Sequence, residues 1–204
     1  MPHRVKPSAT LITFTANPER EIEYHTRRCY ASHHKMNSDG TPNRKFLTGV
    51  RNAGHLGCFE FAHATFEVVC KRNISHQWER SRTQSYLEMS QRYVKLDDIP
   101  YICEHPDSFF ANMVHAQMTD AEVRYNTAID HGVKPEDARD LLPTCTATNF
   151  SACANFTNWR KFIQLRATNK AQKEIRLLSH SVLRQLHQIA PSVFQDLYDQ
   201  FLTD

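Results

Sequence analysis

The chain has 204 residues, of which 40% are hydrophobic and 23% charged, and its formal net charge is +3. This length is ample for one sizeable core, and the charge is too small to indicate a dedicated nucleic-acid or membrane-surface binder. No uninterrupted apolar stretch approaches the ~18–20 residues needed to span a bilayer, and the first residues lack an apolar signal region. We therefore expect a cytoplasmic protein.

The first part of the chain predicts two strands separated by a helix and a loop. Ala9–Thr15 is β-branched and aromatic, as strands often are. Asn17 is a candidate N-cap before a first-turn proline, which predicts a helix over Pro18–Ala31. The polar stretch Ser32–Arg44, with Asp-Gly and Thr-Pro, indicates a loop. Phe61–Lys71 mixes alternation with Val-Val and predicts the second strand.

The second part predicts mostly helices. Ser75–Tyr93 is expected to be helical or irregular, and Pro100–Asn112 irregular. Thr119–Glu122 has the pattern of a capping box, so a helix should begin there and end near Gly132. The further helices expected are Pro135–Leu142, Asn149–Ala167, Lys170–Ala190 and a short one that ends at Leu202. These elements predict a single, helix-rich α+β domain.

Six cysteines are spread along the chain without a Cys-x-x-Cys pair. We expect reduced, mostly buried thiols, with Cys58 and Cys153 as small buried residues. Cys29, His33 and His34 are the nearest approach to a metal cluster, but they fit a solvated helix end, so no metal is expected. The five glycines form no Rossmann or P-loop pattern, which argues against those nucleotide folds.

The stretch from Gln77 to Tyr93 is dense in arginine and hydroxyl side chains and poor in apolar ones. Arg80, Arg82 and Arg92 are planar donors that can hold phosphate oxygens in pairs. The alternative is a solvated helix face held by pairs of arginine and carboxylate. A third reading is a nucleic-acid-binding module that uses the aromatic side chains of Trp78, Tyr86 and Tyr93 for backbone contact and base stacking.

A second concentration of polar groups lies among aromatic residues between Asn155 and Arg166. Arg166 sits next to an apolar helix face, which is an awkward place for a charge unless something anionic or electron-rich meets it. The alternative is an arginine whose guanidinium reaches water past the helix end.

Together these stretches resemble the flavin-dependent thymidylate synthases. Arg80, Arg82 and Ser90 occupy the outer positions of that family's signature, which is Arg-His-Arg followed by seven residues and Ser. The other matching blocks are 53–60 (AGHLGCFE), Leu142-Pro143 followed by Asn155, Leu165-Arg166-Ala167, and Ala171-Gln172 with Glu174-Ile175. The spacings agree from about Leu11 to Leu186, so the resemblance covers most of the chain.

This resemblance implies the family's fold, helix-rich α+β with an antiparallel sheet, and a homotetramer with active sites at subunit interfaces. It implies FAD as cofactor and reductive methylation of dUMP, and as an option UMP, at C5. Methylenetetrahydrofolate would give the carbon and NADPH would reduce the flavin. The family needs no cysteine nucleophile, which fits a chain with no cysteine in its arginine-rich blocks.

The resemblance also assigns residues position by position. The nucleotide-binding positions are Gln77, Arg80, Glu88, Ser90, Gln91, Arg92, Arg139 and Arg166. The FAD-binding positions are His55, Gly57, Arg80, Ser81, Arg82, Glu88, Asn155, Phe156, Thr157 and Lys161. Arg166 aligns with the catalytic arginine that contacts the uracil. A fixed cation there would stabilise the charge that makes C5 nucleophilic.

Three positions depart from the family pattern. Ser81 replaces the signature histidine, Leu87 stands where an asparagine is usual, and Thr157 replaces a frequent arginine. Each lost charged contact to the flavin could weaken binding by about 1.5–3 kcal/mol if nothing replaces it. These departures leave a changed substrate, or a catalytically silent homologue, as alternatives to an active enzyme.

Overall fold

The computed structural model describes residues 1–203, and within them the chain divides into two compact units. The first unit comprises Met1–Ser8, Val68–Arg80 and Leu87–Phe150. The second comprises Ala9–Glu67, Ser81–Tyr86 and the chain from Ser151 onward. No described helix is long and apolar enough to cross a membrane.

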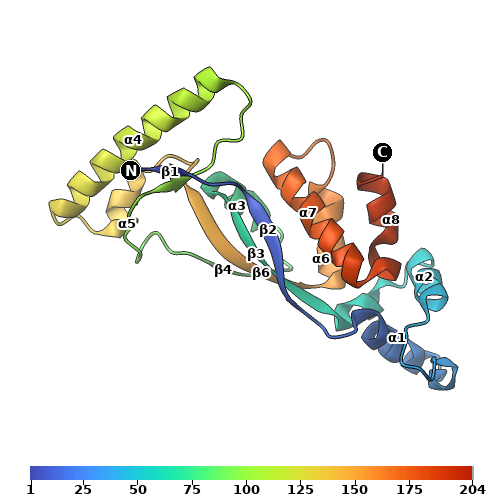
Figure 1. Cartoon of the computed structure of the whole chain (residues 1–204). Coiled ribbons are helices and arrows are strands. Elements are labelled where there is room, and N and C mark those ends of the chain that lie inside the picture. The colour runs from blue at the N-terminus through green and yellow to red at the C-terminus, as the bar shows by residue number, and fades with distance from the viewer. Residues whose placement is uncertain (204) are drawn as a thin grey trace. The chain divides into compact units, whose positions relative to one another are not determined.

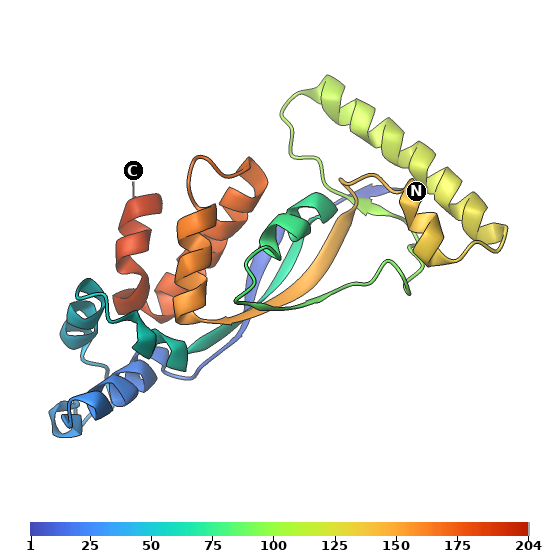
Figure 2. The same cartoon turned by 180° about the vertical axis from the view of Figure 1, so that it is seen from behind.

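An antiparallel sheet of four strands has the order β2-β3-β6-β4. Its strands are β2 (Ser8–Phe14), β3 (His63–Lys71), β4 (Ser85–Glu88) and β6 (Ala147–Asn155). Figures 1 and 2 show β3 and β6, its two longest strands, side by side. Every second residue of β3 from Ala64 to Cys70 is buried, which is the two-residue period of a strand with one face on a core.

The second unit contains most of the helices. They are α1 (Pro18–Cys29), α2 (Arg44–Asn52), α6 (Phe156–Arg166), α7 (Lys173–Ile189), α8 (Pro191–Phe201) and the 3₁₀ segments η1 (His33–Lys35) and η2 (Leu56–Phe61). Helix α7 buries one stripe of residues at intervals of three and four, as its sequence predicts: Ile175, Leu178, Val182 and Leu186. Helices α6, α7 and α8 pack on one another, as both views show (Figures 1 and 2).

The first unit contains a two-stranded parallel sheet and the longest helix of the described chain. Strands β1 (His3–Arg4) and β5 (Pro100–Tyr101) pair in parallel. The helices are α3 (Arg72–Trp78), α4 (Ser108–Asp130), α5 (Pro135–Ala138) and the 3₁₀ segment η3 (Arg139–Leu141). One face of α4 packs into an apolar cluster made by Leu96, Ile99, Tyr101, Cys103, Met118, Tyr125 and Ala138.

Several sequence predictions are confirmed. Helix α1 begins at Pro18, α4 ends two residues before Gly132, and the predicted strands correspond to β2 and β3. Asn17 caps α1 without a side-chain hydrogen bond, because its backbone is left-handed (φ 47°). Its carbonyl oxygen accepts from the Glu21 N–H instead, at 3.1 Å.

The predicted helix over Asn149–Ala167 is wrong in its first half, which is strand β6. Phe150, Ala152 and Ala154 are buried on one side of this strand, so the period is two and not 3.6. The helix starts only at Phe156, because Asn155 is extended and its Oδ1 accepts from the Asn158 N–H at 2.9 Å.

The predicted capping box at Thr119 is also wrong. Helix α4 begins at Ser108, where Asp107 is the N-cap and accepts from the Phe109 N–H at 2.8 Å. Thr119 lies inside the helix, and its hydroxyl donates to the His115 carbonyl oxygen at 3.0 Å. The real cap therefore falls within the stretch that we expected to be irregular.

Other elements were missed because tertiary pairing or short length hides them. They are α2, β4, β5 and the turn η1 inside the predicted loop over residues 32–44.

The cysteine prediction is right on redox state, since all six are free. It is wrong on burial: Cys70 and Cys103 are buried, Cys58, Cys145 and Cys153 are half-buried, and Cys29 is exposed.

Candidate functional site

Two of the predicted nucleotide ligands, Arg92 and Arg139, flank one carboxylate in the first unit. Arg92 Nε donates to Glu136 Oε2 at 2.8 Å, and Arg139 follows Glu136 by one helical turn. The hydrogen bond from Arg92, with smaller contributions from Lys134 and Arg139, holds the pKa of Glu136 below its ordinary value. Both arginines are exposed, so the structure places them in one cationic patch that could receive phosphate oxygens.

The residues Ser90 to Arg92 form a tight turn beside this patch. The Ser90 carbonyl oxygen accepts from the Val94 N–H at 3.0 Å, and Ser90 Oγ accepts from the Arg92 N–H at 3.3 Å. Gln91 is buried, and its Nε2 has no hydrogen-bond partner among the described residues. A buried amide without a partner destabilises the protein, so an acceptor supplied by a ligand would be favourable here.

Glu88 lies at the end of β4, also in the first unit, and is held by two neighbours. Arg72 Nη1 is 2.8 Å from Glu88 Oε1, and the Thr148 hydroxyl donates to the same oxygen at 3.0 Å. A second carboxyl that the sequence reading missed, Glu79, stands near it. Burial raises the pKa of Glu79, and the negative charge of Glu88 adds to the shift. Gln77 is half-buried on α3, whereas Arg80 is exposed two residues after its end.

In the second unit, the predicted FAD-binding residues gather around the start of α6. Asn155 caps this helix, and the Asn158 side chain donates to the Thr83 carbonyl oxygen at 2.9 Å. Lys161 Nζ lies 3.5 Å from Asn158 Oδ1. Asn158, which the sequence reading missed, therefore joins the helix start to the segment that carries Ser81 and Arg82. Arg82 itself is exposed.

Thr157 and Phe156 have structural contacts of their own. The Thr157 hydroxyl donates to the Leu56 carbonyl oxygen at 2.7 Å, which fixes α6 beside His55 and Gly57. The Phe156 ring is fully buried and packs on Phe194 at 5.2 Å between ring centroids. The Phe156 N–H also has a partner within the protein, since it donates to the Ala62 carbonyl oxygen at 2.8 Å.

Arg166 ends α6 and is half-buried. Burial lowers the pKa of its guanidinium, while the nearby Tyr86 acts in the opposite direction. The Tyr86 hydroxyl in turn donates to the Ser81 carbonyl oxygen at 2.8 Å. Tyr86 thus connects the surroundings of the catalytic candidate Arg166 to Ser81, whose own Oγ is buried and has no partner among the described residues.

His55 lines a pocket of about 560 Å³, a volume within the usual range of small-molecule binding sites. The other lining residues include Tyr30, Lys35, Lys45 and Phe46, none of which the sequence reading singled out. Tyr30 is the C-cap residue of α1, and the others come from η1 and α2, so only the folding of the second unit brings them to His55. Aromatic and cationic groups around one histidine suit a flat, anionic ligand.

The search for metal sites gives no candidate. Among residues 1–203, no group of three or more His, Cys, Asp or Glu side chains could hold a metal ion.

The nucleic-acid alternative loses one of its stacking residues, because Trp78 is fully buried and packs on Phe150.

Comparison with protein families gives one match that spans most of the chain. The family model described as "Thymidylate synthase complementing protein" matches residues 10–192. This range is close to the one over which the spacings of the sequence blocks agree.

Curated relatives agree with this match. A flavin-dependent thymidylate synthase of Mycobacteroides abscessus is 32% identical over 203 residues, covering 90% of this chain and 81% of the relative. The corresponding protein of Geobacter sulfurreducens is 33% identical over 201 residues, covering 91% and 84%. A probable flavin-dependent thymidylate synthase of Mycobacterium phage L5 is 32% identical over 193 residues, covering 87% and 79%.

The fold has a close counterpart among solved structures. A UMP/dUMP methylase from Streptomyces cacaoi, crystallised with 5-Br dUMP, superposes with a TM-score of 0.84. The two chains are 19% identical, and the match covers 98% of each. At this identity the likeness establishes the fold, and it confirms the predicted α+β architecture with an antiparallel sheet.

Proposed function

Since the chain belongs to the flavin-dependent thymidylate synthase family, we propose that it methylates a uridine monophosphate reductively at C5. In this proposal dUMP becomes dTMP, and UMP is the second substrate to be tested. Methylenetetrahydrofolate gives the carbon and NADPH is the reductant. The observation that carries the proposal is the gathering of the predicted FAD-binding residues around the start of α6, inside a chain that matches the family over residues 10–192.

The chain is an enzyme of this family, and its cofactor is FAD. The residues present fit that cofactor. The buried Ser81 Oγ has no partner among the described residues, and Lys161 adds an exposed positive charge on α6. The dipole of α6 favours a phosphate at its N-terminus, where the Phe156 and Asn158 N–H groups already donate to Ala62 and Asn155. When bound, FAD supplies the reducing equivalents for the methylation.

We assign the holding of FAD to residues of the second unit that surround the start of α6. Asn155 fixes the first turn of α6 by accepting from the Asn158 N–H. Lys161 adds a positive charge one turn further along the helix. Thr157 and Asn158 keep the neighbouring segments in place through Leu56 and Thr83. His55, Gly57, Ser81 and Arg82 complete this set in the second unit, whereas Arg80 and Glu88, the other FAD-binding positions of the resemblance, belong to the first unit.

We assign the nucleotide phosphate to the cationic patch of the first unit. Arg92 and Arg139 provide charge-assisted hydrogen bonds, and Glu136 holds Arg92 ready in one orientation. The turn at Ser90 presents its hydroxyl and the buried Gln91 amide next to Arg92. Gln77, Arg80 and Glu88 are the further nucleotide ligands of this proposal.

Arg166 is the catalytic residue of the proposal. Arginine side chains stay protonated in proteins, so the half-buried guanidinium of Arg166 is a fixed cation. Next to the uracil it would stabilise negative charge on the ring, which makes C5 the nucleophile. A cation in a partly desolvated place stabilises such charge more strongly than one in water.

We further propose that the chain works as a homotetramer. The side of α4 that does not face the core of the first unit exposes large apolar side chains. Phe109 is 71% exposed, Met113 55% and Val123 61%. Exposed apolar groups of this size along one helix are typical of surfaces that bind another chain. Light scattering of the purified protein measures the mass directly.

The deciding experiment combines a spectrum with an assay. The purified protein should show flavin absorbance, and dUMP should stimulate its NADPH oxidation. Mass spectrometry should detect dTMP only when methylenetetrahydrofolate is present, and the same reaction with UMP decides the second substrate. A protein that carries no flavin and takes up none on titration would refute the proposal.

The catalytically silent alternative has its own test in the variant Ser81→His/Thr157→Arg. A large gain in FAD affinity together with recovered turnover would indicate that the natural residues have lost the chemistry. If instead the unsubstituted protein turns over dUMP, the site is adapted to Ser81 and Thr157, and the silent alternative is wrong.

A further inference from the structure

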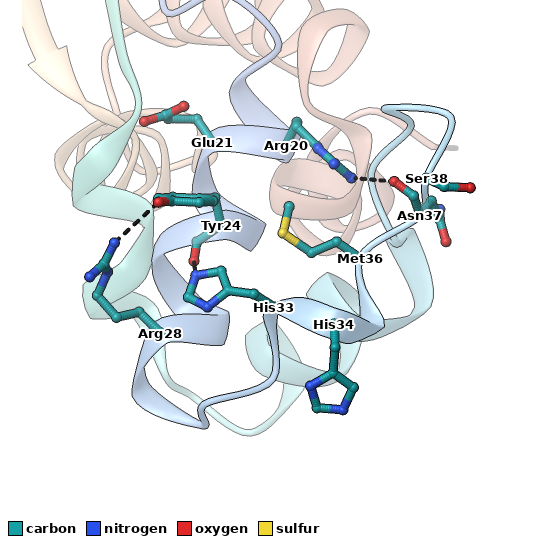
Figure 3. A pocket seen from close by; sticks show the side chains of 9 residues that line it. All are labelled: Arg20, Glu21, Tyr24, Arg28, His33, His34, Met36, Asn37 and Ser38. Carbon is teal, nitrogen blue, oxygen red and sulfur yellow. Dashed lines mark hydrogen bonds between the residues drawn. The ribbon is translucent and has the colours of Figure 1, made fainter.

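A second pocket of the unit that holds the FAD residues is not used by the proposed reaction. It has a volume of about 820 Å³ and lies between α1 and the segment from η1 to Ser38 (Figure 3). The α1 residues that line it include Arg20, Tyr24 and Arg28. These positions are four residues apart, so they share one face of the helix, and the outer two are separated by about 12 Å of axial rise.

The middle of this pocket is aromatic and apolar. Figure 3 shows Tyr24, Met36 and His33 together, with the guanidinium of Arg20 on one side of them and that of Arg28 on the other. The ring centroids of Tyr24 and His33 are 4.9 Å apart, and Tyr24 is 41% exposed. The planes of these two rings are tilted by 55°, and the Arg28 guanidinium carbon lies 5.6 Å from the Tyr24 ring centroid. A flat ring could stack on the exposed part of Tyr24, with its edge toward His33 and a cation at each end.

In the described part of the chain, the guanidinium groups of Arg20 and Arg28 are not paired with a carboxylate, and most of their N–H donors are left for a ligand. Arg20 Nη1 donates to the carbonyl oxygens of Asn37 and Thr41, and Arg28 Nη2 donates to the Tyr24 hydroxyl. All three acceptors are neutral. Within the described residues neither arginine forms an ion pair, although an arginine has five N–H donors to offer.

The acidic groups nearby do not cancel this charge. Glu21 lines the pocket, but its Oε1 lies 3.0 Å from His25 Nε2, and Figure 3 shows its carboxylate pointing away from Met36. Asp39 does not line the pocket. Its carboxylate accepts from the Thr41 N–H and hydroxyl, and it feels Arg20 only weakly.

We propose that this pocket binds a nucleoside bisphosphate. The base would stack on Tyr24 with its edge toward His33, and the two phosphates, one on each side of the ribose, would reach Arg20 and Arg28. Arginine suits this task because its planar fork meets two phosphate oxygens at once. None of the residues assigned to FAD or to the uridylate lines this pocket, so a negative result here leaves that proposal untouched.

Calorimetry on the FAD-loaded protein saturated with dUMP tests this site, because the proposed FAD and uridylate sites are then already occupied. The probe is adenosine 2′,5′-bisphosphate, with adenosine and pyrophosphate as the ring-only and charge-only comparisons. We expect the bisphosphate to bind at least tenfold more tightly than either. No binding of the bisphosphate, or pyrophosphate binding just as tightly, overturns the proposal.

Variants then locate the binding. Arg28→Gln should weaken bisphosphate binding at least tenfold, and Tyr24→Leu about fivefold, whereas Tyr24→Phe keeps the ring and should bind as before. Arg176→Gln is the matched control, because Arg176 also donates from a helix to a loop, at Asn169, but lies outside the pocket. Arg20→Gln is not used as a test, because Arg20 also holds the loop at Asn37 and Thr41. The Arg28 and Tyr24 variants therefore decide whether the pocket binds the bisphosphate. Unchanged affinity in Arg28→Gln refutes the site.

Discussion

The predicted nucleotide residues of the first unit and the predicted FAD residues of the second unit are held in different ways. In the first unit, Arg92 and Arg139 are exposed, and Arg92 is held by a hydrogen bond to the surface carboxylate of Glu136. In the second, Asn155 and Thr157 also hold the start of α6 in the fold. From this difference we expect a substitution among the nucleotide residues to affect ligand binding alone. A substitution among the FAD residues should affect stability as well.

The largest effect on turnover is expected at Arg166, the proposed catalytic residue that would contact the uracil. Arg166→Ala should lower kcat by roughly 10²–10³, the usual loss for one preorganised electrostatic donor. FAD absorbance and the melting temperature should stay close to those of the unsubstituted protein. Steady-state kinetics with dUMP checks the turnover, and normal turnover contradicts the assigned role. Arg166→Lys should restore only part of the rate, because an ammonium lacks the planar fork.

The phosphate ligands should show binding loss without destabilisation. Arg92→Ala or Arg139→Ala should raise KM for dUMP by at least tenfold, since a hydrogen bond to a charged group contributes about 1.5–3 kcal/mol. The melting temperature should hardly move, because an exposed ion pair such as that of Arg92 with Glu136 stabilises by at most about 1 kcal/mol. Arg124→Ala, which breaks another exposed pair in the same unit, is the control and should leave KM unchanged.

The cap of α6 should show both effects at once. Asn155→Ala removes the acceptor of the Asn158 N–H and should destabilise the protein by about 1 kcal/mol, or roughly 2–4 °C in melting temperature. It should also weaken FAD binding. Asp107→Ala removes the equivalent cap from α4 in the first unit, so it should lower stability by a similar amount. Equal loss of FAD in both variants would show that the effect is only one of general stability.

The smallest expected effect concerns Glu79. Its pKa is raised in the folded protein, mainly by burial, so folding favours its protonated form. Its stabilising contribution is therefore complete below its unfolded pKa, and it is lost as the pH rises through the higher folded value. Urea unfolding from pH 4 to pH 7 should show Glu79→Gln gaining stability relative to the unsubstituted protein as the pH rises. A difference that does not change with pH would contradict this account.

The family of this chain was more predictable from the sequence than the local structure around the candidate site. The positions of Arg80, Arg82 and Ser90 in one run, and of Arg166 further along, were enough to indicate the family that the comparisons confirm. Glu136, Glu79 and Asn158 were missed, because each acts through a partner that is distant in sequence. Nothing in the local pattern marks an acid or an amide as the one that holds Arg92 or the segment at Thr83.

By itself, the sequence determined the chemistry of this protein: the family, the flavin, and the kinds of side chain available for a nucleotide. It also determined helices such as α7, whose apolar period is visible in one segment. Only the tertiary structure decided that residues 147–155 form a strand, and which residues line the pockets beside α1. The reason is physical: a strand is stabilised by pairing with strands far away in the chain, and a pocket is built by residues that meet only after folding.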